Sequence, residues 1–102
     1  MRRVLLRQVA IDELADITEF IADDKPAAAR RVLEAVERCI AHIAAFPESA
    51  PLLTNVLRHE LKGIRRAVVT PFRTIVLFYL TDDNLIDIVS IRRAEQSTDW
   101  LG

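Results

Sequence analysis

Basic side chains in the second half of the sequence could bind a phosphate or a carboxylate group. Between positions 58 and 73 they outnumber the acids, of which Glu60 is the only one, and two more arginines end a later apolar run. The members of this basic set are Arg58, Lys62, Arg65, Arg66, Arg73, Arg92 and Arg93. If neighbouring strands about 4.8 Å apart carry them, one arginine from each could meet at a single anion, which a planar guanidinium binds well. The alternative is that these arginines only keep exposed strand faces and edges soluble.

Three other side chains are of types that occur in metal sites or in acid–base catalysis. Cys39 and His42 are three residues apart, which suits one helix face, but Cys39 continues an apolar stripe and no second ligand pair follows. His59 could act as a general acid or base, yet it stands alone. The two glycines, Gly63 and Gly102, provide neither a nucleophile elbow nor a phosphate-binding loop. We therefore expect no metal site, no cofactor and no catalytic triad.

Acidic side chains gather near the start of the chain. No lysine or arginine interrupts this acidic run, whose members are Asp12, Glu13, Asp16, Glu19, Asp23 and Asp24. Such a run is most often a solvated helix face. It could also receive a basic segment of a partner, because like charges at helical spacing slightly destabilise a helix and need some reason to persist.

The elements that must position these residues follow from the hydrophobic pattern. Helices are predicted by apolar residues at intervals of three and four over 11–22 and 26–46. Strands are predicted over 4–9, 64–70, 73–81 and 85–91. Residues 48–60 are predicted to form an irregular connection with a helical turn around 52–57. The order β-α-α-β-β-β predicts an α+β fold, in which a helical hairpin packs on a small antiparallel sheet and the first strand joins at an edge.

Length and composition limit what the chain can be. Its 102 residues predict a single domain over 1–102, and 51% apolar residues suffice for a core without metal or disulfide support. Cys39 is the only cysteine, and no apolar run reaches the roughly 20 residues of a membrane span, so we expect a cytoplasmic protein without a membrane segment. The net charge of -1 lacks the positive field of a nucleic-acid binder, so we expect no sequence-specific DNA binding by this chain alone.

The order and spacing of these segments together resemble the ParE/RelE toxin family. The resemblance covers residues 4–93 and is strongest at 10–22, 26–30, 61–63, 72–79 and 88–93. It implies the toxin of a type II toxin–antitoxin pair, with a fold that agrees with the predicted order of elements.

Two activities occur in this family. ParE-like members bind and block DNA gyrase without chemistry of their own, whereas RelE-like members cleave messenger RNA on the ribosome through clustered basic residues and usually a C-terminal Tyr or His. The tail 94–100 has neither, and arginine, with a pKa above about 12, is a poor general base at neutral pH. We therefore favour a ParE-like gyrase inhibitor that is not an enzyme. The first alternative is a metal-independent mRNA endonuclease using Arg66, Arg73, Arg92 and Arg93; the second is an inactive partner-binding module.

The resemblance also suggests which surfaces bind partners. The expected target-binding residues are Arg66, Arg73, Arg92, Arg93 and Trp100, of which Trp100 is an aromatic anchor. The other expected partner is a cognate antitoxin, part of which folds onto the toxin as a helix on the helical hairpin and sometimes also adds a strand to the sheet. We expect Asp16, Glu19 and Phe20 to contact that antitoxin.

Overall fold

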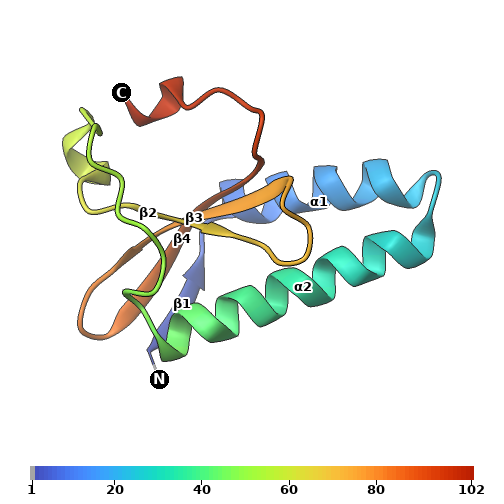
Figure 1. Cartoon of the computed structure of the whole chain (residues 1–102), viewed down its shortest axis with the longest axis horizontal. Helices are drawn as coiled ribbons and strands as arrows, with labels where there is room; N and C mark the ends of the chain where they lie inside the picture. The colour runs from blue at the N-terminus through green and yellow to red at the C-terminus, as the bar shows by residue number, and fades with distance from the viewer. Residues whose placement is uncertain (1) are drawn as a thin grey trace.

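The computed structural model describes residues 2–102, which form two helices and one four-stranded sheet (Figure 1). The elements in chain order are β1 (Arg3–Leu6), α1 (Gln8–Ala22), α2 (Pro26–Ala45), β2 (Arg65–Val68), β3 (Ile75–Thr81) and β4 (Leu85–Arg93). Two short 3-10 turns, η1 (His59–Leu61) and η2 (Asp99–Leu101), lie in the connection before β2 and in the C-terminal tail. The predicted order β-α-α-β-β-β and the α+β class are confirmed.

The sheet has the strand order β1-β4-β3-β2 and is mixed. β3 runs antiparallel to both β2 and β4, as the predicted meander requires. β1 does join at an edge, but it pairs with β4 in parallel, so the sheet is not wholly antiparallel. Two chain reversals, between β2 and β3 and between β3 and β4, give β4 the same direction as β2. β1 shares that direction.

The second helix begins where local chemistry predicts, and the first does not. Pro26 is the first residue of α2, where its missing N–H costs no hydrogen bond. The first helix starts earlier than predicted, at Gln8, because the chain turns sharply after the short strand β1. None of the helices among residues 2–102 combines the length and apolar character needed to cross a membrane.

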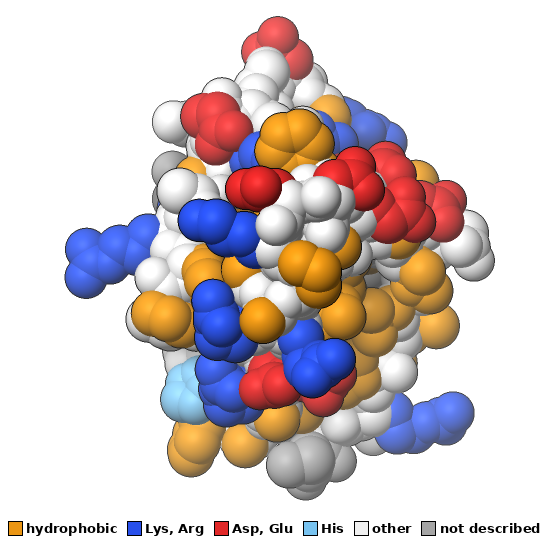
Figure 2. All heavy atoms as spheres, turned by 90° about the vertical axis from the view of Figure 1, so that its right-hand side faces the viewer, with side chains coloured by type: hydrophobic (Ala, Val, Ile, Leu, Met, Phe, Trp, Pro, Cys, Tyr) orange, Lys and Arg blue, Asp and Glu red, His pale blue; other side chains and the backbone are white. Residues whose placement is uncertain are grey.

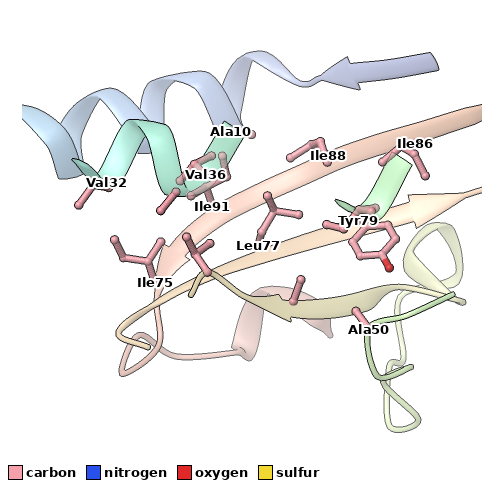
Figure 3. Packing of buried hydrophobic residues seen from close by; sticks show 14 of the residues in the cluster. Ala10, Val32, Val36, Ala50, Ile75, Leu77, Tyr79, Ile86, Ile88 and Ile91 are labelled. Atoms are coloured by element: carbon pink, nitrogen blue, oxygen red, sulfur yellow. The ribbon is translucent and has the colours of Figure 1, made fainter. Parts of the chain in front are cut away.

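One face of the sheet, here called the helix face, packs against α1 and α2 (Figure 3). Its buried strand residues are Ala67, Ile75, Leu77, Tyr79, Ile86, Ile88 and Ile91. A β-bulge at Val89 places both Ile88 and Ile91 on this face, although they are three residues apart, since Phe78 pairs with Ser90 and Tyr79 with Ile88. The buried Tyr79 hydroxyl donates a hydrogen bond to the carbonyl of Pro47 at 2.8 Å.

The opposite face, here called the tail face, carries Val76, Phe78 and Val89, and among residues 2–102 no α-helix covers it. Irregular segments cover it instead, the connection 53–64 and the C-terminal tail 94–102, and Figure 1 shows them on the side of the sheet away from α2. The predicted helical turn around 52–57 is wrong. Leu52 forms a β-bridge with Arg65, and Val56 is buried on the tail face, so this stretch lies extended along the sheet. The helical turn forms later, at η1.

Candidate functional site

Arg92 lies at the centre of a hydrogen-bonded network at one edge of the tail face. Its Nε donates to Ser90 Oγ at 2.8 Å and lies 3.3 Å from Glu13 Oε2. The Ser90 hydroxyl donates to Glu13 Oε1 at 2.8 Å, and the backbone N–H of Ile91 donates to the same oxygen at 3.2 Å. The Glu13 carboxylate thus accepts hydrogen bonds from Ser90 and Ile91 and forms an ion pair with Arg92, so the charge of Arg92 is locally balanced.

Glu13 reaches β4 because β1 ends early. The pairing of β1 with β4 stops at Leu6, and α1 follows alongside the remainder of β4. Arg7 anchors this corner through hydrogen bonds from its guanidinium to Asp87 at 2.9 and 3.0 Å. Beyond the end of β1, where β4 has no neighbouring strand, the Glu13 carboxylate accepts a hydrogen bond from the Ile91 N–H. The prediction that Glu13 belongs to a solvated acidic face is therefore wrong, since only 24% of its side chain is exposed.

Trp100 packs on Arg92 and on the sheet. The guanidinium carbon of Arg92 lies 4.5 Å from the centre of the indole ring, a cation–π distance, and the ring meets Phe78 edge to face at 5.1 Å. Its indole Nε1 is buried and forms no hydrogen bond with any residue of the range 2–102. Trp100 is thus a half-buried aromatic with one unused donor, set beside a cation.

The tail that carries Trp100 is fastened by Arg58. The Arg58 guanidinium donates to the Trp100 carbonyl at 2.9 Å, and the Arg58 N–H donates to the Leu101 carbonyl at 3.2 Å. Leu101 is 7% exposed and packs into the apolar cluster of the tail face. The sequence placed Arg58 in the basic set, but the structure gives it this role in docking the tail. The only sequence signal for it is the apolar pair Trp100-Leu101 at the end of a polar tail.

The four predicted target-binding arginines do not form one clamp. Arg66, opposite Phe78 on β2, shares the tail face with Arg92, two strands away. Arg73 is exposed in the turn between β2 and β3. Arg93 lies opposite Ile75, and its guanidinium is 5.4 Å from the Phe20 ring of α1. The arginines are therefore dispersed over both faces of the sheet and the turn between β2 and β3.

The expected antitoxin-binding residues share α1. Asp16 and Glu19 are exposed, and Phe20 is 71% exposed although it is a large apolar side chain. In Figure 2, which views the end of the molecule where α1 joins α2, acidic side chains gather at the upper right and basic ones lie mainly to the left and below. The contact between Phe20 and Arg93 connects the helical surface to the basic one.

The side chains first considered for metal or acid–base chemistry lie apart from this network. Cys39 is half-buried beside the core, and burial raises the pKa of its thiol. His42 is exposed and contacts Phe46, with ring centres 5.1 Å apart. Within residues 2–102, no three His, Cys, Asp or Glu side chains are grouped so that they could hold a metal ion.

Comparisons with known proteins agree with this fold. The family model described as "ParE toxin of type II toxin-antitoxin system, parDE" matches residues 4–98. Among solved structures, the chain is similar to one from the "Chromosomal ParDE TA system from P. aeruginosa", with a TM-score of 0.74 and 15% identity over 93% of this chain and 98% of that one. At that identity the likeness concerns the fold, and no curated protein matches. Because the family model spans nearly the whole chain, this protein belongs to the ParE toxin family of type II toxin–antitoxin systems.

Proposed function

We propose that this ParE-family toxin inhibits DNA gyrase by binding it through the tail face, and that it acts in the cytoplasm, where gyrase works. The observation that carries the proposal is the Arg92–Trp100 stack, in which a cation and an aromatic ring lie together at 4.5 Å on a face without helices. Arginine and tryptophan are the residue types that contribute most to binding at protein interfaces. Glu13 holds the Arg92 guanidinium in place before any partner arrives.

Three further arginines extend this surface. Arg66 lies on the same face, while Arg73 and Arg93 carry positive charge to the turn and to the α1 side. Dispersed charges of one sign steer an acidic partner toward an interface and orient it, while a buried centre supplies most of the affinity. We therefore assign the centre to Arg92 and Trp100 and the rim to the other three.

The cognate antitoxin is proposed to bind the exposed side of α1. Phe20 offers a large apolar contact, and Asp16 and Glu19 offer negative charge beside it. This combination fits an amphipathic helix that carries basic residues. Since Phe20 contacts Arg93, an antitoxin helix seated there would also cover one end of the basic surface.

The test is inhibition of DNA supercoiling by purified toxin and gyrase. Trp100→Ala should raise the concentration needed for half-inhibition about 10-fold or more, as expected for an interface anchor. Arg30→Ala, which removes an exposed arginine on α2, should leave that concentration unchanged. A wild-type chain that leaves supercoiling untouched but cleaves messenger RNA on ribosomes would contradict the proposal in favour of the RelE-like activity. A chain that does not slow growth when induced without antitoxin would be the inactive module.

A further inference from the structure

Ser90 connects Arg92 to Glu13 through two hydrogen bonds. Apart from Tyr79, it is the only buried residue with a polar or charged side chain among residues 2–102. The Ser90 hydroxyl donates to Glu13 Oε1 at 2.8 Å and accepts from Arg92 Nε at 2.8 Å. A guanidinium can only donate and an ionised carboxylate can only accept, so the direction of both hydrogen bonds is fixed. The hydroxyl therefore has one orientation, and it holds the Arg92 side chain in one place.

These contacts use only part of the Arg92 guanidinium. Its Nε is engaged by Ser90 and Glu13, and one face of the planar group lies 4.5 Å from the centre of the Trp100 ring. The terminal nitrogens Nη1 and Nη2 form no hydrogen bond with any group of residues 2–102, yet neither is buried, and 23% of the side chain is exposed. The free edge of the guanidinium therefore reaches solvent in a fixed orientation.

The other arginines proposed to bind the target are not held in this way. Within the described range 2–102, no hydrogen bond fixes the guanidinium of Arg66 or Arg93. Arg93 lies 5.4 Å from the Phe20 ring, and Arg73 is exposed in a turn. A side chain that is fixed before binding loses less conformational entropy when a complex forms. Arg92 is therefore the arginine best prepared to bind a group of the target.

The free edge of Arg92 has the geometry to bind a carboxylate. Parallel N–H bonds from Nη1 and Nη2 match the oxygens of a carboxylate, and a phosphate could also accept them. The surrounding charge favours the carboxylate. Glu13 already balances Arg92, and the tail that covers this face carries exposed acids at Glu95 and Asp99. A nucleic acid brings many negative charges and would be repelled here, whereas an acidic side chain brings only one.

We propose that Ser90 and Glu13 are positioning residues, which hold Arg92 so that Nη1 and Nη2 bind one Asp or Glu carboxylate of the target. Neither positioning residue touches the target. The indole of Trp100 covers the guanidinium from one side, which excludes water and strengthens the hydrogen bonds to the carboxylate. This inference rests on the proposed inhibition of gyrase, and it adds the chemical group that is recognised and two residues that act through Arg92.

The first test measures the dissociation constant of purified toxin and gyrase without DNA. Arg92→Lys keeps the positive charge but loses the planar fork, so it should raise the constant about 10-fold or more. Ser90→Ala removes the hydroxyl that fixes Nε and should raise it about 5-fold. Thr18→Ala is the matched control, because it removes a half-buried hydroxyl that bonds only within α1, and it should bind as the wild type does.

A pair of variants at Glu13 separates hydrogen bonding from charge. Glu13→Ala removes both and should weaken binding about 5-fold, as Ser90→Ala does. Glu13→Gln keeps an oxygen that accepts from Ser90 and from the Ile91 N–H, so it should recover most of the affinity. Equal losses in the two variants would overturn positioning through hydrogen bonds.

Nuclear magnetic resonance tests the positioning without gyrase. In the wild-type toxin the Arg92 Nε–H should exchange slowly with water, because Ser90 accepts its hydrogen bond. Ser90→Ala should speed this exchange about 10-fold, whereas a residue that only supports the fold would leave it unchanged in the folded variant. If Ser90→Ala does not fold, the two Glu13 variants provide the same comparison.

The two proposals fail in distinguishable ways. Equal binding of gyrase by Ser90→Ala and by the wild type would overturn the positioning role and leave gyrase as the target. Affinity that depends on Arg92 only when DNA is added would overturn the carboxylate in favour of a phosphate. A wild-type chain that does not bind gyrase would contradict the proposed function and the recognition of its carboxylate, while exchange of the Arg92 Nε–H would still decide the roles of Ser90 and Glu13.

Discussion

The two faces of the sheet are covered in different ways. The helix face is sealed by two regular helices whose apolar stripes cover Leu77 and Tyr79. The tail face is sealed by an irregular connection and by the C-terminal tail, fastened mainly through Arg58 and Leu101. Segments with few buried contacts open locally at low free-energy cost, whereas regular cores open only with the whole domain. The helix face thus gives the domain its stability, and the tail face keeps the adaptability that binding requires.

The largest expected effect compares one leucine from each face. Leu77→Ala on the helix face should lower the free energy of unfolding by about 3 kcal/mol, because the side chain is fully buried and the neighbours cannot fill the cavity. Leu101→Ala on the tail face should cost about 1 kcal/mol, because a chain end can move to close the space. Urea denaturation of both variants measures the difference. Equal losses would mean that the two faces are equally rigid.

A smaller effect should appear at the single tyrosine. Tyr79→Phe removes the hydrogen bond to the Pro47 carbonyl and should cost about 1 kcal/mol at neutral pH. Burial raises the pKa of Tyr79 above its ordinary value of about 10, so the folded chain holds this proton more tightly than the unfolded chain does. The stabilisation by protonated Tyr79 is therefore complete below about pH 10, the pKa of tyrosine in the unfolded chain. It is lost as the pH rises through the higher pKa of Tyr79 in the folded chain.

Tyrosinate absorbance measures this ionisation directly, because Tyr79 is the only tyrosine. The variant Tyr79→Phe should show a flatter loss of stability at alkaline pH than the wild type. A tyrosinate transition centred at or below pH 10, roughly the ordinary tyrosine value, would show that the helix face admits water at this point.

The smallest effect on stability is expected at Arg58, and the structural change should be confined to the C-terminal tail. Arg58→Ala removes the guanidinium that holds the Trp100 carbonyl and should cost less than about 1 kcal/mol, since the group is exposed. The tail should nevertheless loosen, and the emission of Trp100, the only tryptophan, should shift to longer wavelength while the far-ultraviolet circular dichroism stays the same. Lys62→Ala, at an exposed position of the same connection, is the control. Unchanged emission would mean that Leu101 alone fastens the tail.

The fold was largely predictable because its regular elements carry strong local signals. The stripes of the two helices and the proline at position 26 predict a helical hairpin, and the apolar run of β3 predicts a central strand. The parallel pairing of β1 was not predictable, since a four-residue strand carries no signal for its direction. The bulge at Val89 likewise follows from pairing between strands, which local patterning does not encode.

The candidate site was predictable in its types of residue and not in its connections. The spacing places Arg92 at the end of a strand and Trp100 in the tail. Nothing near Glu13 indicates that it pairs with Arg92, 79 positions further along the chain. Likewise, nothing near Arg58 indicates that it binds Trp100, 42 positions further along. For the Glu13 contact the one available signal is Ser90, a polar residue within an apolar strand that had to find a buried partner. Contacts between residues so far apart in the sequence depend on tertiary packing, which the hydrophobic periodicity of the sequence does not predict.

The carboxylate of Glu13 has a further consequence for how the protein behaves in a crowded solution. Past the end of β1, β4 would present an unpaired border on which other chains could assemble into aggregates. There the Glu13 carboxylate accepts the hydrogen bond of the Ile91 N–H, and its negative charge repels the backbone carbonyl of an incoming strand. The protein thus protects this border of its sheet against unwanted association with a single side chain.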